Sequence, residues 1–335
     1  MRNKDRVLGT LYGQAIGDAM GMPSELWPVE KIRQRFGEIT TFLDGPTDND
    51  VAKNFVKGEY TDDTNQALAI LDALIENHWQ PDQQLIANHL IAWAISVDAW
   101  QKNILGPSSK AALTAIKAGR DPRSITDQAL TNGAGMRIAP VGALFEPDEL
   151  PELVSLVAQV TKVTHSSDVA ISGACLIAGA VTAGVVDQSW DEMMTFALQA
   201  SDLGLKMGAP TWAAKVHARL ELGLALAKRY RGHTAAFSKA IYDLIGTGTM
   251  VSESVPAAVA IAYFTRNVAD CARLCANLGG DTDTIGAMAC AICGAKTGID
   301  ELPLEWITLI DERNSQHDLK KYAEKMMRFQ LSTRG

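Results

Sequence analysis

Apolar residues recur along most of the chain at the three- and four-residue spacing of helices that bury one face. Between residues 64 and 76, for example, Leu68, Leu71 and Leu74 lie on a single helical face. No stretch alternates apolar and polar residues over the length that a half-buried strand requires. The pattern predicts helices over residues 6–20, 64–76, 83–97, 108–118, 149–161, 166–186, 190–201, 210–230, 234–245, 255–264, 268–277, 284–294 and 317–329.

The segments between these helices are mostly short and carry the glycine and proline residues typical of turns. Residues 42–59 are the exception, a long polar stretch that contains Asp48, Asn49 and Asp50. Long loops within compact domains are often functional, so we expect this loop to contribute to a site. The sequence contains no evident linker, repeat or low-complexity tract. We therefore expect an all-α fold, with a single compact multi-helix domain over residues 1–335.

The composition fits this picture and limits the classes of partner. With 47% hydrophobic and 21% charged residues, the chain is typical of globular rather than disordered proteins. A formal net charge of −8 gives no basic footprint, so we expect no nucleic-acid partner. Residues 169–186 approach membrane-spanning length, but small residues dominate them, which favours a core helix and no membrane partner. No apolar stretch follows the charges near Met1, so we expect a cytoplasmic protein.

Four of the five cysteines have a spacing that superficially suggests zinc. Cys271 and Cys275 form a C-x3-C pair, and Cys290 and Cys293 form a C-x2-C pair. Zinc-binding cysteines usually occupy tight turns, whereas these lie in alanine-rich helical sequence. We interpret them, together with Cys175, as small buried thiols.

Two of the predicted helices begin with clusters of acidic and hydroxyl residues that lie far apart in the sequence. The first cluster is Tyr60-Thr-Asp-Asp-Thr64, and the second is Gly279-Gly-Asp-Thr-Asp-Thr284. Thr and Asp are favoured at helix N-termini, where one side chain suffices as a cap. Each cluster contains more acids than a cap needs. Carboxylates mixed with hydroxyls are also the hard oxygen donors that Mg²⁺, Mn²⁺ or Ca²⁺ prefer.

If the two helix starts meet, four Asp carboxylates crowd one point, which is unfavourable unless protons or cations neutralise them. Two divalent ions carry a matching charge of +4. Gly279 and Gly280 would permit the close backbone approach that such a site needs. Among the acids that precede the first cluster, Asp18 and Glu25 are further candidates. Taken alone, Glu25 is typical of a surface residue near a helix end, and Asp18 fits a structural role at least as well as a catalytic one.

These clusters belong to a larger set of ordered motifs that spans almost the whole chain. The set comprises Gly9-Thr-Leu-Tyr-Gly-Gln-Ala-Ile-Gly-Asp-Ala-Met-Gly21 with Glu25, Tyr60–Thr64, Asn132-Gly-Ala-Gly-Met-Arg137 before Ala139-Pro140, Thr164-His165, and Gly279-Gly-Asp-Thr-Asp-Thr-Ile-Gly286. In content and order it resembles the ADP-ribosylglycohydrolase family, which includes dinitrogenase-reductase-activating glycohydrolases and ADP-ribosyl-acceptor hydrolases. The resemblance implies an all-α fold with a binuclear magnesium or manganese centre in a cleft.

The resemblance also implies roles for individual residues. The metal ligands would be Thr61, Asp62, Asp63, Asp281, Asp283 and Thr284, and they would hold two divalent ions, Mg²⁺ or Mn²⁺. Glu25, Asp62 and Asp283 would be catalytic, with Glu25 as an acid/base group or a gate. Glycine-rich turns would cradle the diphosphate through backbone N–H groups, with 246–248 a weaker candidate than 106–109 and 132–137. The substrate-binding candidates are Gly106, Ser108, Asn132, Gly133, Gly135, Met136 and His165, with a structural hydrogen bond favoured for His165 over proton transfer.

The predicted function is metal-dependent cleavage of the N- or O-glycosidic bond of an ADP-ribosylated protein or small ADP-ribosyl conjugate. Arginine, serine and other acceptors stay open, as does the oligomeric state. One alternative is a metal-dependent hydrolase of a free nucleoside or small N-glycoside, which would not need diphosphate loops. A second alternative is a non-catalytic protein of a crystallin-like or ADP-ribose-binding kind. Such a protein would be expected to have lost some of the metal-ligating residues. This chain retains Glu25 and both acidic clusters, so that alternative ranks lower.

Overall fold

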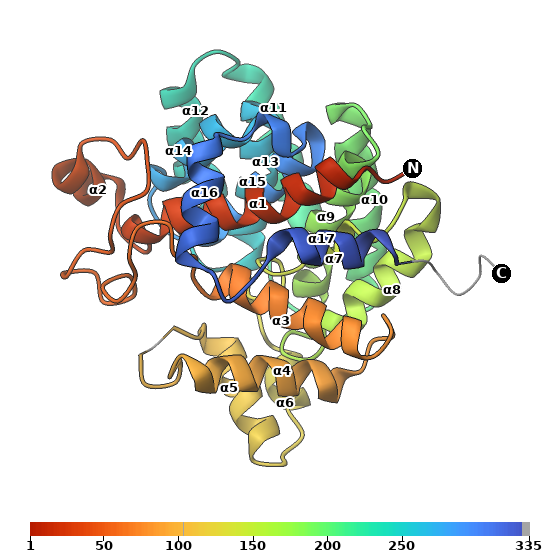
Figure 1. The fold of residues 1–335 in the computed structure, drawn as a ribbon. Coiled ribbons are helices and arrows are strands. Elements are labelled where there is room, and N and C mark those ends of the chain that lie inside the picture. Colours follow the sequence, from red (N-terminus) through yellow and green to blue (C-terminus); the bar gives the residue numbers. More distant parts are fainter. Residues whose placement is uncertain (103, 330–335) are drawn as a thin grey trace.

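Helices make up the regular structure of the computed structural model, which describes residues 1–102 and 104–329 (Figure 1). Within those residues no strand forms, and extended pairing is limited to isolated bridges such as Trp27 with Gly280. The α-helices are α1 (Lys4–Gly21), α2 (Val29–Phe36), α3 (Asp62–Glu76), α4 (Gln83–Ser96), α5 (Pro107–Lys117), α6 (Arg123–Thr126), α7 (Ala139–Gly142), α8 (Leu150–Thr161), α9 (Asp168–Val185), α10 (Trp190–Leu205), α11 (Val216–Arg229), α12 (Thr234–Ala240), α13 (Val251–Thr265), α14 (Val268–Ala276), α15 (Thr282–Thr297), α16 (Leu304–Arg313) and α17 (Leu319–Met327). Short 3₁₀ turns occur at η1 (Met22–Ser24), η2 (Pro147–Glu149) and η4 (Ile299–Glu301), and a π turn at η3 (Ile241–Ile245). The all-helical prediction is confirmed.

The core is built around α1, α9, α13 and α15, whose side chains are almost all buried. In Figure 1, α1 crosses in front of α15, while α3 and α4 to α6 lie below them. The helix Asp168–Val185 is long and apolar enough to cross a membrane, but every one of its residues is buried in the fold. This burial agrees with its interpretation as a core helix. The five cysteines are likewise buried and unpaired, as expected.

A stripe of glycines allows α1 and α15 to touch through their main chains. Gly9, Gly13, Gly17 and Gly21 are four residues apart and lie on one face of α1. A Cβ added at Gly13 would lie 2.3 Å from the carbonyl oxygen of Cys290, and one at Gly17 would lie 2.0 Å from that of Gly286. Gly9 faces Gly294 and Gly21 faces Thr282, so the two helices are antiparallel. The end of α1, with Asp18, and Glu25 after the turn η1 are thereby brought to the acidic start of α15.

Most predicted helices agree with the structure to within a few residues, and the differences have local causes. The helix predicted over 210–230 begins only at Val216. The preceding segment is a loop because Thr211 donates a hydrogen bond to Asp168 (2.6 Å) and Lys215 pairs with the same carboxylate (2.5 Å). The helix predicted over 234–245 changes to a π turn after Ala240. Helices α2, α6, α7 and α16 lie outside the predicted set. Helix α2 has only eight residues and buries only Ile32, so it is too short and too polar to stand out.

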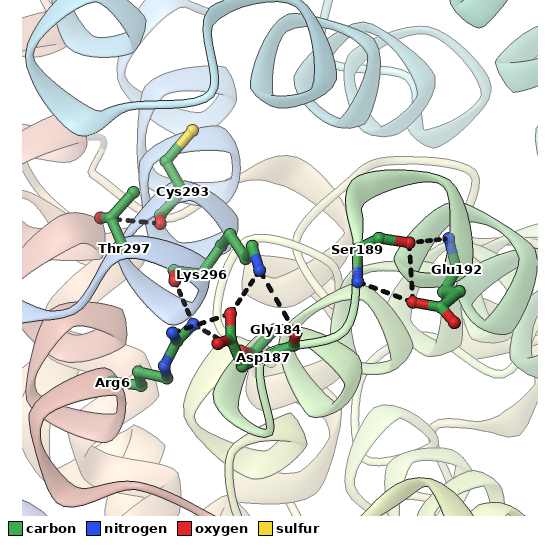
Figure 2. Close-up of polar contacts among 8 residues, drawn as sticks. All are labelled: Arg6, Gly184, Asp187, Ser189, Glu192, Cys293, Lys296 and Thr297. Carbon is green, nitrogen blue, oxygen red and sulfur yellow. Dashed lines mark hydrogen bonds and ion pairs between the residues drawn. The ribbon is translucent and has the colours of Figure 1, made fainter.

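An ion-pair cluster ties the far end of the α1–α15 contact to the end of α9 (Figure 2). Asp187 accepts from Arg6 at 2.8 Å and also pairs with Lys296. The Arg6 guanidinium donates in addition to the carbonyl groups of Gly184 and Lys296. Three segments that are distant in the sequence therefore meet at one carboxylate.

The close contact between α1 and α15 predicts that adding one methyl group at a contact glycine destabilises the fold. Gly13→Ala would press its Cβ against the Cys290 carbonyl group, and the helices would have to separate. Overpacking of this kind costs about 1–3 kcal/mol of unfolding free energy, which should appear as a lower urea midpoint. Gly106→Ala is the matched control, because nothing lies within 4 Å of its added Cβ. Equal midpoints for the two variants would contradict the packing.

The Asp187 cluster predicts a stability contribution that depends on pH. The hydrogen bond from Lys296 and the charge of Arg6 lower the pKa of Asp187 below its usual 3.8. A lowered folded-state pKa adds stability above the unfolded-state value, and this stability is lost as the pH falls through the folded-state pKa. Asp187→Asn should therefore lower the urea midpoint modestly at neutral pH, because the carboxylate is 60% exposed. The gap to wild type should close below pH 3.8, and a gap that persists there would rule out the charge as its origin.

Candidate metal and substrate site

The two acidic helix starts meet in space. The Thr61 hydroxyl lies 3.0 Å from Asp63 Oδ2 on its own helix and 3.4 Å from Asp283 Oδ2 on α15. Two groups of three carboxyl groups have oxygen atoms within 4.8 Å of one another: Asp18 with Asp63 and Asp283, and Glu25 with Asp281 and Asp283. Asp283 belongs to both groups. The convergence on which the metal hypothesis depends is therefore present.

Asp18 caps the start of α3, so the acids of α3 itself are not needed as caps. Helix α3 has no cap from the side chain of its own N-cap residue, Thr61. Instead, the buried Asp18 carboxylate of α1 accepts from the Thr61 and Thr64 backbone N–H groups (2.8 and 3.0 Å) and from the Thr64 hydroxyl (2.6 Å). These bonds satisfy donors that a helix start leaves open. Of the two roles considered for Asp18, the geometry favours the structural one.

The start of α15 is shaped by two glycines and held by neighbouring loops. Gly279 and Gly280 have φ values of 80° and 85°, which a residue with a side chain rarely adopts. The bend lets the Asp281 N–H donate to the Thr247 carbonyl at 2.7 Å. The Asp281 side chain does not cap its own helix either, and accepts instead from Asn132 Nδ2 at 2.5 Å. Asp63 of α3 and Asp281 and Asp283 at the start of α15 thus face the shared space. Asp62 lies outside both groups of three and accepts from Gln66 of its own helix.

The site concentrates acidic side chains that have no ion-pair partner among the residues that the structure describes. Burial raises the pKa values of Asp18 and Asp281 to about 6. Burial together with repulsion from Asp18 and Asp281 raises the pKa of Asp62 to about 8. The pKa values of Glu25, Asp63 and Asp283 are raised for the same reasons. In residues 1–102 and 104–329, no lysine or arginine lies in ion-pair contact with these six groups. Neutralisation must therefore come from protons or from bound cations.

The donors present suit a hard divalent cation. Asp63 Oδ1 is buried without a hydrogen-bond partner, an arrangement that costs free energy unless something else binds the oxygen. The surrounding donors are carboxylates and the hydroxyls of Thr61 and Thr284, the latter within hydrogen-bond reach of Asp281. Such an all-oxygen set is typical of Mg²⁺ or Mn²⁺ sites rather than zinc sites. The residues fit the predicted metals.

Glu25 lies at the accessible side of this cluster. It and Asp62 are half-buried, whereas Asp18, Asp63, Asp281 and Asp283 are no more than 4% exposed. The Glu25 backbone is fixed from the long polar loop, because the buried Asn49 donates to its carbonyl oxygen at 2.9 Å. The expectation that this loop contributes to a site is thus supported through Asn49, while Asp48 and Asp50 pair with surface lysines.

The residues predicted to bind substrate differ in their exposure and in the hydrogen bonds that they already make. Ser108, in the first turn of α5, is half-buried and accepts from Thr131, and Gly106 before it is exposed. His165 is fully buried, with Nδ1 2.8 Å from Thr164 Oγ1 and Nε2 2.9 Å from Thr131 Oγ1. Burial and the charge of Arg137 lower its pKa to about 3, so it is neutral at physiological pH. These contacts match the structural hydrogen bond favoured for His165.

The loop between Asn132 and Arg137 lies mostly in the interior. Asn132 directs its amide to Asp281 and to Ser254, so it holds a predicted metal ligand. Gly133 lies against the His165 ring, and Gly135 packs near Val255 and Met288. Met136 is buried, and its carbonyl accepts from Gln14. A direct substrate contact stays a prediction for these four loop residues.

The weaker candidate, Gly246–Gly248, already holds a carboxylate. The Gly248 N–H donates to Glu253 Oε2 at 3.1 Å, and a Cβ at Gly246 would also meet Glu253. An anionic phosphate would face that charge directly. The structure instead gives this loop a positioning role, since Thr247 holds the Asp281 backbone.

The sequence predicts no individual role for Gln66 or for Arg137, although Arg137 ends the candidate loop 132–137. Gln66 donates to Asp62 Oδ2 at 2.8 Å, and the buried Arg137 guanidinium donates to Gln66 and to Thr164. A charged residue within the apolar sequence around Met136 and Ile138 was the available signal, since unpaired arginines are rarely buried.

Comparison with known proteins gives this site its family. A family model described as ADP-ribosylglycohydrolase matches residues 1–334. The chain is thus a hydrolase acting on glycosidic bonds, and it belongs to the ADP-ribosylglycohydrolase family. This result confirms the resemblance read from the ordered motifs.

Individual relatives cover nearly the full chain. The uncharacterised protein YegU of Escherichia coli (strain K12) is 41% identical over 97% of both chains. The ADP-ribosylarginine hydrolase Tri1 of Pseudomonas putida (strain GB-1) is 25% identical over 96% of this chain and 78% of its own. The ADP-ribosyl-[dinitrogen reductase] glycohydrolase of Rhodospirillum rubrum is 24% identical over 92% and 90%. A solved structure titled ADP-ribosylglycohydrolase-related protein complex shares the fold, with a TM-score of 0.70 at 23% identity over 97% and 98%.

The unpartnered carboxylates predict that divalent ions stabilise the folded protein. An ion at about 100 times its Kd adds about 2.7 kcal/mol, so Mg²⁺ or Mn²⁺ should raise the thermal midpoint. Asp283→Asn should raise the midpoint of the metal-free protein, because one of the repelling groups is gone, and should abolish most of the metal-induced rise. Asp50→Asn, at a carboxylate 93% exposed, is the control that should respond like wild type. A wild-type midpoint that ignores both ions would remove the metal site.

Proposed function

We propose that the protein is a divalent-metal-dependent hydrolase that releases ADP-ribose from an ADP-ribosylated protein or small conjugate by cleaving its N- or O-glycosidic bond. One observation carries the proposal: two helix starts more than 200 residues apart converge, with Asp18 and Glu25, into two groups of carboxyl groups that share Asp283. Within the first group, Asp63 Oδ1 is buried without a hydrogen-bond partner. The family and the names of its hydrolase members support ADP-ribosyl conjugates as the substrate class.

The predicted ligands Thr61, Asp62, Asp63, Asp281, Asp283 and Thr284 would hold the ions. Bound there, divalent ions would fix the hydroxyls of the distal ribose and favour ionisation of water near neutral pH. The protein supplies the orientation: Gln66 holds Asp62, Asn132 holds Asp281, and Asn49 holds the Glu25 backbone.

Glu25 is the carboxylate best placed to move a proton. It is half-buried, next to Asp283, and its pKa is raised by burial and by the charge of Asp281 and its neighbours. In the proposed reaction, Glu25 takes a proton from water as the water oxygen bonds to the anomeric carbon. The bond to the acceptor breaks, its electron pair stays on the acceptor nitrogen or oxygen, and that atom gains a proton. A carboxyl group of raised pKa can both accept and return the proton.

A substrate panel tests the proposed function. Peptides ADP-ribosylated on arginine or on serine should release ADP-ribose in the presence of Mg²⁺ or Mn²⁺, and chelation should stop the release until metal is restored. Free nucleosides serve as the comparison, since their cleavage requires no diphosphate site. Release from nucleosides but from none of the peptides would establish the alternative hydrolase, and no turnover of any compound with metal present would contradict both.

Glu25→Gln separates proton transfer from metal binding. The amide keeps the size of the side chain and its contact with Asp283 but cannot take up a proton, so turnover should fall by about 10²–10⁴-fold. The thermal shift with Mn²⁺ should largely remain. Glu38→Gln, an exposed position, is the control and should retain full activity. Wild-type turnover in Glu25→Gln would remove the assigned role.

A further inference from the structure

Arg137 is among the largest fully buried side chains. It lies between Gln66, beside the predicted metal ligand Asp62, and Thr164, beside His165. It is 2% exposed, and burial lowers its pKa to about 10, so it is still charged at neutral pH. Its guanidinium donates to Gln66 Oε1 on α3 and to Thr164 Oγ1 in the loop after α8. Because a guanidinium has only donors, it fixes which atom of each partner must accept.

The first arm leads to the predicted metal ligand Asp62. Gln66 must turn its oxygen toward Arg137, which leaves its NH₂ group to face Asp62. The Nε2 atom donates to Asp62 Oδ2 at 2.8 Å. Arg137 therefore determines that Asp62 meets a donor here and not a second oxygen.

The second arm leads to Ser108 through three further residues. The Thr164 hydroxyl accepts from Arg137, so its own proton goes to His165 Nδ1, 2.8 Å away. His165 is neutral and has one N–H, which must then be on Nε2 and donate to Thr131 at 2.9 Å. The Thr131 hydroxyl in turn donates to Ser108 Oγ at 2.9 Å. Each bond is directed away from Arg137.

We propose that Arg137 is a positioning residue that sets the direction of all the hydrogen bonds between Asp62 and Ser108, and leaves the Ser108 hydroxyl to donate to a phosphate oxygen of the substrate. That Ser108 donates to a phosphate oxygen rests on the proposed function. The direction of the hydrogen bonds between Asp62 and Ser108 is independent of it. Ser108 lies half-buried in the first turn of α5, where the helix dipole also favours an anion. The single buried charge of Arg137 thus orients two donors. The Gln66 amide faces the predicted metal ligand Asp62, and the Ser108 hydroxyl would face the diphosphate.

The tautomer of His165 tests the direction of the bonds in the intact wild-type protein. Long-range ¹H–¹⁵N NMR of the histidine rings, assigned with a His165→Asn sample, should show His165 neutral with its proton on Nε2 across the neutral pH range. A proton on Nδ1, or a cationic ring, would reverse at least one bond and overturn the proposal. This readout does not depend on any catalytic activity.

Threonine variants test the arm to Ser108. Thr164→Val removes the hydroxyl that fixes His165, so the Kd for ADP-ribose and the KM for an ADP-ribosyl peptide should rise roughly ten-fold, the effect of one charge-assisted hydrogen bond. The kcat and the Mn²⁺ affinity should stay near wild type. Thr164→Ser should restore binding. Thr161→Val is the matched control, because the Thr161 hydroxyl is also buried but has no partner. Equal loss in Thr161→Val and Thr164→Val would contradict the directed chain.

Gln66→Glu tests the other arm. The new carboxylate can still accept from Arg137 but presents a second acceptor to Asp62, so Mn²⁺ affinity by calorimetry should fall about 10–100-fold. The Kd for ADP-ribose without metal should change little. Unchanged Mn²⁺ affinity would overturn this arm. If the wild type cleaves no ADP-ribosyl compound, the proposed function fails, while the His165 tautomer still decides whether the bonds run as inferred.

Discussion

The site depends on the distance between two helix backbones. With a glycine at every fourth position, α1 packs against α15 with no side chain between them, as at Gly13 and Cys290. Because the helices are antiparallel, the end of α1 lies at the acidic start of α15, and Asp18 reaches from α1 to the start of α3. Three helix termini are thus fixed around one small volume. Wider separation of α1 and α15 would move Asp283 away from Asp63 and divide the carboxylates.

The same arrangement concentrates charge at a cost to stability. Carboxylates that crowd together away from water, with no cation beside them among the described residues, are unfavourable, and the raised pKa values of Asp62, Asp63 and Asp283 reflect this. The helices are capped by groups from outside, so their own first-turn acids stay available. Asp18 caps α3, and Asn132 binds the Asp281 side chain. Perturbed carboxyl groups of this kind are typical of functional sites, and a ligand that binds the folded protein offsets their cost.

The sequence predicted the helical class, the two acidic clusters and the family because each is encoded locally. Apolar spacing marks helices such as α3, and the motifs around Asp62 and Asp283 occur in a fixed order. What depends on tertiary contact was not predictable. Asp18 could not be assigned as a cap without knowing that Thr61 and Thr64 lie beside it. Likewise, Glu253 fills the Gly246–Gly248 loop through a bond that the glycine pattern cannot reveal.

The contact between the α1 glycines and α15 also determines which residues can be exchanged without moving the carboxylates. Where main chain meets main chain, no exchange of side chains can readjust the spacing, so the geometry of the carboxylates is insulated from change elsewhere. Ser108, Thr131 and residues 248–250 are half-buried and lie outside that contact. Under the proposed function, preference for one acceptor over another would change at such positions while the carboxylate cluster stays the same.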